Sequence, residues 1–211
     1  MNPTTKHSSA GFTLVELAVT ATVLLIVLAG VAVAAGKASD AYEQARVRGR
    51  LVSVGYQALD RIASEFIEAE EGSMSVAGVG VGASTMTYRV ADGAGGFSPD
   101  RTIRFEMVPG EFNDGVDNNG DGRIDEARIV WIEDEGGANE RSVVLTNNVR
   151  SMFGNETANF IDDDGNGVTD EPGLVFQRDG EVVNIQFTLE QLDPSGRAIS
   201  KSFQTSARAR N

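Results

Sequence analysis

The spacing of hydrophobic residues changes twice along the chain and divides it into three parts. The first part, residues 12–36, is apolar at almost every position. Its 24 residues from Phe12 to Ala35 form a helix of about 36 Å at the usual helical rise, which is long enough to cross the hydrocarbon core of a bilayer. The pattern predicts a transmembrane helix over residues 12–36, behind a short polar segment at residues 1–11.

In the second part, apolar residues recur at steps of three and four, which places them on one face of a helix. Charged residues fill much of the remaining surface, and no proline interrupts the pattern before Gly72. The sequence predicts that the helix continues as an amphipathic helix over residues 37–72 and buries its apolar face. The residues of this face are Leu51, Val54, Ala58, Ile62, Phe66 and Ala69.

The third part, residues 73–211, changes to an alternation of apolar and polar residues, which is typical of strands with one wet face. Seven strands are expected, separated by turns rich in glycine, aspartate and serine. They are Thr85–Val90, Thr102–Val108, Arg128–Ile132, Ser142–Leu145, Leu174–Gln177, Val182–Leu189 and Ile199–Thr205, and the glycine-rich residues 76–83 are expected to form a loop or a weak strand. The predicted fold class is α+β, with a long N-terminal helix packed on an antiparallel β-sheet domain.

Composition narrows the function classes. The 211 residues carry a net charge of −13, which argues against nucleic acid as the main partner because phosphate binding needs a basic surface. There is no cysteine, and the one histidine is His7 in the first polar segment. Residues 12–211 therefore lack the side chains of Ser-His-Asp and Cys-His nucleophilic sites and of the usual zinc sites. We expect a protein that is not an enzyme.

A Gly-Phe-Thr-Leu-Val-Glu block opens the apolar run, and its Glu16 is a functional candidate because an ionisable group in an apolar span is costly. Gly11, Phe12 and Glu16, with the polar leader and the long apolar run, resemble the processing and methylation motif of type IV prepilins and type II secretion pseudopilins. The resemblance implies a pilin-like fold, a leader at residues 1–11, cleavage after Gly11 by a prepilin peptidase and methylation of Phe12. It also implies that the Glu16 carboxylate meets the N-terminal amine of a neighbouring subunit during assembly.

The same resemblance implies a single-pass protein of the bacterial inner membrane with a periplasmic C-terminal domain, which is extracted into a pilus or pseudopilus. Flanking charge alone favours the opposite orientation, because Lys6 precedes the apolar run and Lys37, Arg46, Arg48 and Arg50 follow it. Two other interpretations remain open, a plain membrane anchor and a secretory signal peptide cleaved after residues 32–34. The apolar run of 24 residues is longer than the roughly 7–15 residues of the hydrophobic region of a typical signal peptide.

The C-terminal third resembles the J-type minor pseudopilins and related minor type IV pilins. The blocks that carry this resemblance are residues 140–145, 148–152 and 182–189 and the final strand, which ends in Thr205–Asn211. It implies a minor subunit at or near the tip of a type II secretion pseudopilus or a type IV pilus. Its partners would be other minor pseudopilins or pilins and the major subunit.

Two acidic loops interrupt that pattern, the first acidic loop at residues 111–126 and the second acidic loop at residues 159–173. They are copies at a constant offset of 45 residues, and residues 111–126 and 162–171 each carry a net charge of −5. The shared pattern D-x-[DN]-G-[DN]-G-x-x-D-E resembles the first half of an EF-hand loop and the calcium repeats of thrombospondin type. Position 12 of the EF-hand, normally glutamate, is Arg128 or Gly173 here, and the flanks are predicted strands.

Calcium takes about six to eight oxygen ligands, and alternate residues of a tight turn converge on one point. We therefore expect two Ca²⁺ ions; Mg²⁺ fits less well because it needs a stricter octahedron. The candidate ligands are Asp117, Asn119, Asp121, the Arg123 carbonyl and Asp125 or Glu126 in the first loop, and Asp162, Asp164, Asn166, the Val168 carbonyl and Asp170 or Glu171 in the second. The alternative is a pair of solvated turns without metal.

Two functions follow from these patterns. One is a minor pilin-like subunit that assembles with its neighbours and is stabilised by calcium. The other is a calcium-dependent adhesive module displayed on a type IV pilus, for which the acidic loops would form the binding surface.

Overall fold

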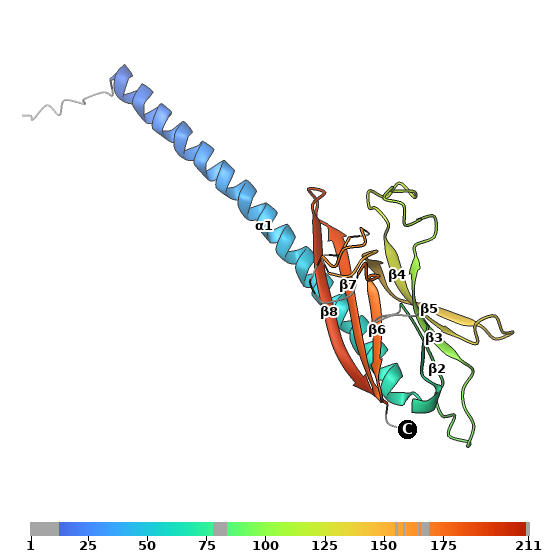
Figure 1. Cartoon of the computed structure of the whole chain (residues 1–211). Coiled ribbons are helices and arrows are strands. Elements are labelled where there is room, and N and C mark those ends of the chain that lie inside the picture. The colour runs from blue at the N-terminus through green and yellow to red at the C-terminus, as the bar shows by residue number, and fades with distance from the viewer. Residues whose placement is uncertain are drawn as a thin grey trace, which may run out of the picture. The chain divides into compact units, whose positions relative to one another are not determined.

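A computed structural model describes residues 13–77, 84–154, 156–157, 159–163, 165 and 169–209. The chain divides into two compact units, residues 1–45 and residues 46–211. One helix, α1 (Leu14–Glu68), contributes residues to both units (Figure 1). The units are described separately below.

In the first unit the described residues form the N-terminal part of α1, which exposes large apolar side chains along its length. Leu14 is 85% exposed and Leu25 is 67% exposed, as are leucines, valines and isoleucines on the intervening turns to similar degrees. Within the described part of the chain this is the one helix long and apolar enough to cross a membrane. A helix that is apolar all round must be covered by lipid or by other helices.

In the second unit, residues 46–68 of α1 pack one face against the sheet. The buried side of the helix includes four of the six apolar positions expected from the sequence, and Ala69 just beyond the helix is buried as well. Val54 instead is partly exposed. The α-helix ends at Glu68, short of Gly72, and a turn of 3₁₀-helix, η1 (Glu71–Ser73), follows it.

The strands described in the second unit belong to one antiparallel sheet with the order β1-β2-β3-β4-β5-β7-β6, and β8 pairs with β7. All seven expected strands are confirmed, with ends displaced by a few residues, and a short strand β1 lies at the edge of the glycine-rich segment. The bounds are β1 Ser75–Ala77, β2 Thr85–Tyr88, β3 Arg101–Met107, β4 Ala127–Glu133, β5 Arg141–Val149, β6 Leu174–Asp179, β7 Val182–Leu192 and β8 Ala198–Arg208. The predicted α+β class is confirmed.

Aromatic rings join the helix to the sheet. Phe66 of α1 lies edge-on to Tyr88 of β2 and Phe176 of β6, with ring centroids 5.4 Å and 5.5 Å apart. Phe203 of β8 lies against Gly55, and a Cβ atom on that glycine would stand only 2.2 Å from the ring. The helix can approach β8 this closely only because Gly55 has no side chain.

A buried polar network also joins the same helix to β2, β3 and β4. Glu65, only 6% exposed, accepts hydrogen bonds from the Tyr88 hydroxyl (2.9 Å) and the Arg101 guanidinium (3.1 Å). Trp131 donates to the Tyr88 oxygen (3.0 Å). Burial and the nearby Glu65 carboxylate raise the pKa of Tyr88 far above its ordinary value. Because every member has partners, the network specifies one position of the helix on the sheet.

Candidate functional site

The N-terminal motif lies partly outside the described residues. Gly11 and Phe12 fall there, so the cleavage point remains a prediction. The Glu16 carboxylate accepts hydrogen bonds from the backbone N and the hydroxyl of Thr13, both at 2.9 Å, and the Glu16 amide donates to the Thr13 hydroxyl at 3.2 Å. This reciprocal pair is a capping box that starts the helix. The Thr-x-x-Glu spacing is the sequence signal for this capping role of Glu16, which is separate from the predicted role in assembly.

Both acidic loops leave the same end of the sheet. Ala127, the first residue of β4, pairs with Met107 at the end of β3 and with Val149 at the end of β5. The first acidic loop follows β3 and the second follows β5, so the topology brings two segments 45 residues apart to one place. The sequence repeat did not reveal this proximity, because it depends on the pairing of β4.

Within the second unit, that end lies near the beginning of its helical segment, residues 46–68 of α1. Leu189 of β7 pairs both with Val149, next to the second loop, and with Lys201 of β8. Further along β8, Phe203 lies at Gly55, and Ala207 lines a pocket together with Ile67. The strand β8 therefore runs in the same direction as residues 46–68 of α1 (Figure 1). The acidic loops accordingly lie nearer to residue 46 than to residue 68.

Asp117 folds the first acidic loop around its own carboxylate. The two oxygens accept hydrogen bonds from the backbone N atoms of Gly120 (2.6 Å) and Gly122 (2.8 Å). Both glycines have positive φ, +79° and +89°, in the left-handed region that glycine adopts without strain. The side-chain oxygen of Asn119 likewise accepts a bond from the Asp121 amide (2.9 Å). The expected ligands thus shape the turn itself.

The second acidic loop repeats this geometry where it is described. Asp162 accepts a hydrogen bond from Gly165 N at 2.6 Å, the same distance as in the first loop. Asp125 and Asp170 each accept bonds from two successive amides, of residues 114–115 and 159–160, and have φ of +52° and +53°. The candidate ligands that lie outside the described residues are Asp164, Asn166 and Val168.

Two buried glutamates close the first acidic loop. Glu111 and Glu126 are each 4% exposed, and Asn119 joins them: its amide donates to Glu111 Oε1 (2.7 Å) and its side-chain Nδ2 to Glu126 Oε1 (2.9 Å). The other oxygen of each carboxylate, Oε2, is buried without a hydrogen-bond partner. A buried carboxylate oxygen without a donor is costly, and it is the kind of atom that a cation satisfies.

The sequence interpretation missed Glu111 and left Asp125 and Glu126 as alternatives. Glu126 presents the unpartnered oxygen, whereas Asp125 caps a turn. Extending the 45-residue offset three positions upstream of Asp114 would have found Glu111 and its counterpart Glu156. Glu156 is fully buried and accepts bonds from the amides of Asp163 (2.9 Å) and Asp170 (3.0 Å).

The side chain of Arg123 lies among the carboxylates of the first acidic loop. Its guanidinium donates to Asp121 Oδ2 at 2.6 Å, lies 3.6 Å from Glu126 Oε1 and also donates to Asn148 Oδ1 of β5. The hydrogen bond from Arg123 lowers the pKa of Asp121, and the carboxylates raise the pKa of Arg123. The sequence interpretation used only the carbonyl of this residue, whose role as a ligand remains a prediction.

No three Asp, Glu, His or Cys side chains within the described ranges are already gathered around one point as a metal site. The chemistry of the loops nevertheless fits a hard cation, because carboxylate oxygens are the ligands calcium prefers. In the first loop, the buried Oε2 atoms of Glu111 and Glu126 are acceptors without a hydrogen-bond donor, which is consistent with this fit.

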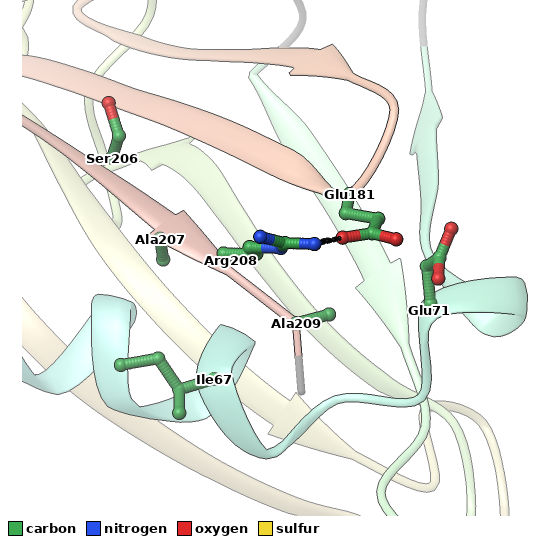
Figure 2. Close-up of a pocket in the computed structure, with 7 residues that line it drawn as sticks. All are labelled: Ile67, Glu71, Glu181, Ser206, Ala207, Arg208 and Ala209. Atoms are coloured by element: carbon green, nitrogen blue, oxygen red, sulfur yellow. Dashed lines mark hydrogen bonds and ion pairs between the residues drawn. The ribbon is translucent and has the colours of Figure 1, made fainter. Parts of the chain in front are cut away.

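A pocket of about 560 Å³ lies at the other end of the β7–β8 pair from Leu189. Figure 2 shows the residues that line it. Ile67, Ala207 and Ala209 supply apolar walls, and an ion pair between Arg208 and Glu181 lies beside them. Ser206, the one hydroxyl on its lining, donates to Asn184 at 2.6 Å. The residues that line this pocket do not include a nucleophile paired with a base.

Residues 6–32 match a family model described as the prokaryotic N-terminal methylation motif. The match supports assignment to the type IV prepilin and pseudopilin class, and it points to a structural subunit rather than an enzyme. Together with the apolar helix, it supports a membrane-anchored, single-pass pilin that is processed by a prepilin peptidase and assembles with other pilins. No curated protein and no solved structure matches the chain.

Proposed function

We propose that the chain is a minor pilin or minor pseudopilin of the J type, which assembles at or near the tip of a type IV pilus or a type II secretion pseudopilus. The observation that carries this proposal is the methylation motif at residues 6–32, which leads without a break into a helix 55 residues long. Residues 46–68 of that helix pack on a sheet, while residues 14–33 expose apolar side chains for contact with lipid or other helices.

In this proposal Glu16 directs assembly. After cleavage at Gly11, the new N-terminal amine of a neighbouring subunit would pair with the Glu16 carboxylate in an apolar seam, where both charges are penalised if left alone. The capping box with Thr13 holds the carboxylate at the start of the helix before a partner arrives. The proposal also includes the location of the chain before extraction. Its N-terminal helix would span the bacterial inner membrane, and its C-terminal domain would lie in the periplasm.

We also propose that calcium binds both acidic loops and stabilises the end of the sheet from which they leave. When bound, the ion supplies positive charge to loops that each carry a net charge of −5. In the first loop, Glu111 and Glu126 would hold it through their buried oxygens, and Asp117, Asn119 and Asp121 lie in the same turn. Removing the mutual repulsion of these carboxylates would stabilise the fold.

Assembly is tested by isolating the filament or pseudopilus fraction from cells that express the chain at its natural level. Co-purification with the other minor subunits is the expected result. Recovery of the processed chain in the membrane alone, under conditions in which the other minor subunits assemble, would contradict the proposal.

Calcium is tested by melting the full-length chain in detergent with millimolar Ca²⁺ and with chelator. Binding to the folded state alone stabilises it by about 2.7 kcal/mol per site at a hundredfold excess over Kd. Asp117→Ala and Asp162→Ala should each remove part of the resulting Tm shift, and the double variant nearly all of it. NaCl at matched ionic strength should not reproduce the shift. Equal Tm values in Ca²⁺ and in chelator would show that the loops are acidic turns that do not bind calcium.

One observation favours the second candidate function, an adhesive module on a type IV pilus. Both acidic loops carry highly exposed aromatic side chains, Phe112 at 66% and Phe160 at 91%, which are unusual on a solvated acidic turn. A pulldown with the calcium-loaded full-length chain distinguishes the functions: capture of pilins supports the subunit role alone, whereas capture of an external surface ligand supports adhesion.

A further inference from the structure

We propose that the guanidinium of Arg123 is a built-in counter-cation of the first acidic loop, which competes with calcium and makes this loop the weaker of the two calcium sites. The inference rests on the calcium binding proposed above and adds a difference between the loops that their shared pattern hides. At the position equivalent to Arg123 the second loop carries Val168, which has no charge.

The position of Arg123 carries the argument. Its guanidinium contacts Asp121 at 2.6 Å and approaches Glu126 to 3.6 Å. The cationic group therefore lies beside the Glu126 carboxylate, which Asn119 joins to the Glu111 carboxylate, and the Oε2 atom of each glutamate is buried without a donor. The neighbouring base, Arg128, is directed to Glu106 on β3 instead, at 2.7 Å.

A tether holds the guanidinium there. Arg123 also donates to Asn148, a β5 residue with φ of +63° beside the irregular pairing of β4 and β5. This bond connects the first acidic loop to the strand that leads into the second. Its Nη2 donates to Asp121 and its Nη1 to Asn148, so the guanidinium is oriented toward the carboxylates rather than toward solvent. The side chain is only 27% exposed.

Charge then decides the order of affinity. A unit positive charge a few ångströms from a divalent ion opposes its binding, and partial burial limits screening by solvent. The same charge stabilises the loop when calcium is absent, because it offsets the repulsion of the surrounding carboxylates. The first acidic loop should therefore be the better stabilised of the two without calcium and fill at a higher calcium concentration than the second.

Calcium titration calorimetry on the full-length chain in detergent tests the proposal. Asp162→Ala is used as the background, so that the first loop dominates the signal. Arg123→Val, which introduces the residue of the second loop, should tighten calcium binding at least tenfold and lower Tm in chelator. A purely structural role for Arg123 would lower Tm without tightening binding.

Two control variants separate charge from packing. Arg123→Lys keeps the charge and should bind calcium as weakly as the background. Asn148→Gly removes the tether at a position where glycine accepts the backbone conformation, and should change affinity by much less than Arg123→Val. Calcium binding that is unchanged in Arg123→Val, or tightened equally in Arg123→Lys, would overturn the proposal and leave the calcium site in place. An absence of calcium binding in the unmodified chain would overturn both.

Discussion

Glu16 combines two interactions that substitutions can separate. Its charge is available to a neighbouring amine, and its carboxylate accepts two hydrogen bonds from Thr13 that begin the helix. Loss of a capping interaction costs about 1 kcal/mol, which is small beside the helix as a whole. If assembly fails whenever the negative charge of Glu16 is removed, the pairing of this charge with a neighbouring amine is the functional interaction.

We predict that Glu16→Ala and Glu16→Gln are both processed and inserted but are recruited poorly into filaments. Glutamine can still accept the hydrogen bond of a capping box, so it serves as the matched control for loss of charge alone. The measurement is the ratio of filament-bound to membrane-bound chain. Assembly of Glu16→Gln at the level of the unmodified chain would assign the role to capping and contradict the charge pair.

Gly55 offers a second prediction for a single residue. We expect Gly55→Ala to lower the free energy of unfolding by about 1–3 kcal/mol, as overpacking usually does, because the new methyl group would collide with Phe203. Gly49→Ala is the matched control, since a Cβ there meets nothing within 4 Å and both glycines lie in α1. The two variants are compared by thermal melting, and equal Tm values would contradict the close contact.

The sequence could predict the role of a residue when that role depends on contacts with residues close to it in the chain. The Asp117 turn and its copy at Asp162 follow from local spacing, and the structure has both. The repeat could have singled out Glu111, but local spacing does not show that it is buried. The contact of Arg123 with Asn148 joins segments 25 residues apart, so no local pattern reveals it. Their roles as ligands or counter-ions remain predictions.

Among the elements, seven of the eight described strands were predictable because alternation is strong wherever one face is buried. β7 shows this most clearly, with Val183, Ile185, Phe187 and Leu189 all fully buried. The end of α1 was less predictable. Gly72 is a reasonable stop signal, yet the helix ends at Glu68. The backbone N–H of Glu70 instead donates to the backbone carbonyl of Arg89. A backbone contact with another segment replaced the last helical turn.

The hairpin between β7 and β8 carries a pH-dependent prediction. The hydroxyl of Ser195 and the amide of Arg197 donate to the Asp193 carboxylate and lower its pKa to about 2 from an ordinary 3.8. Because the folded pKa is the lower one, the stabilisation is complete above pH 3.8 and is lost as the pH falls through about 2.

We therefore predict that Asp193→Asn lowers Tm near neutral pH and that its deficit relative to the unmodified chain shrinks between pH 4 and pH 2. Differential scanning calorimetry measures the Tm of the two chains at matched pH. Because both chains contain the other carboxylates, the titration of those groups affects both Tm values and largely drops out of the difference. A deficit that stays constant down to pH 2 would show that the carboxylate charge does not act in this turn.

At the scale of the whole molecule, two kinds of surface suit two environments. The first unit exposes an apolar helix that needs lipid or neighbouring helices. The second has its own core and places its acidic loops at one end and a pocket at the other. This separation is what a subunit needs if one part is to be exchanged between membrane and filament while the other stays folded in water.

The N-terminus of the mature chain tests the central claim most directly. We predict that intact mass spectrometry and N-terminal peptide sequencing of the chain from cells with a prepilin peptidase will find a start at N-methylated Phe12. The same chain from cells without that peptidase should keep its leader. A start at Ala35 or Gly36 would identify a secretory signal peptide and contradict the pilin account.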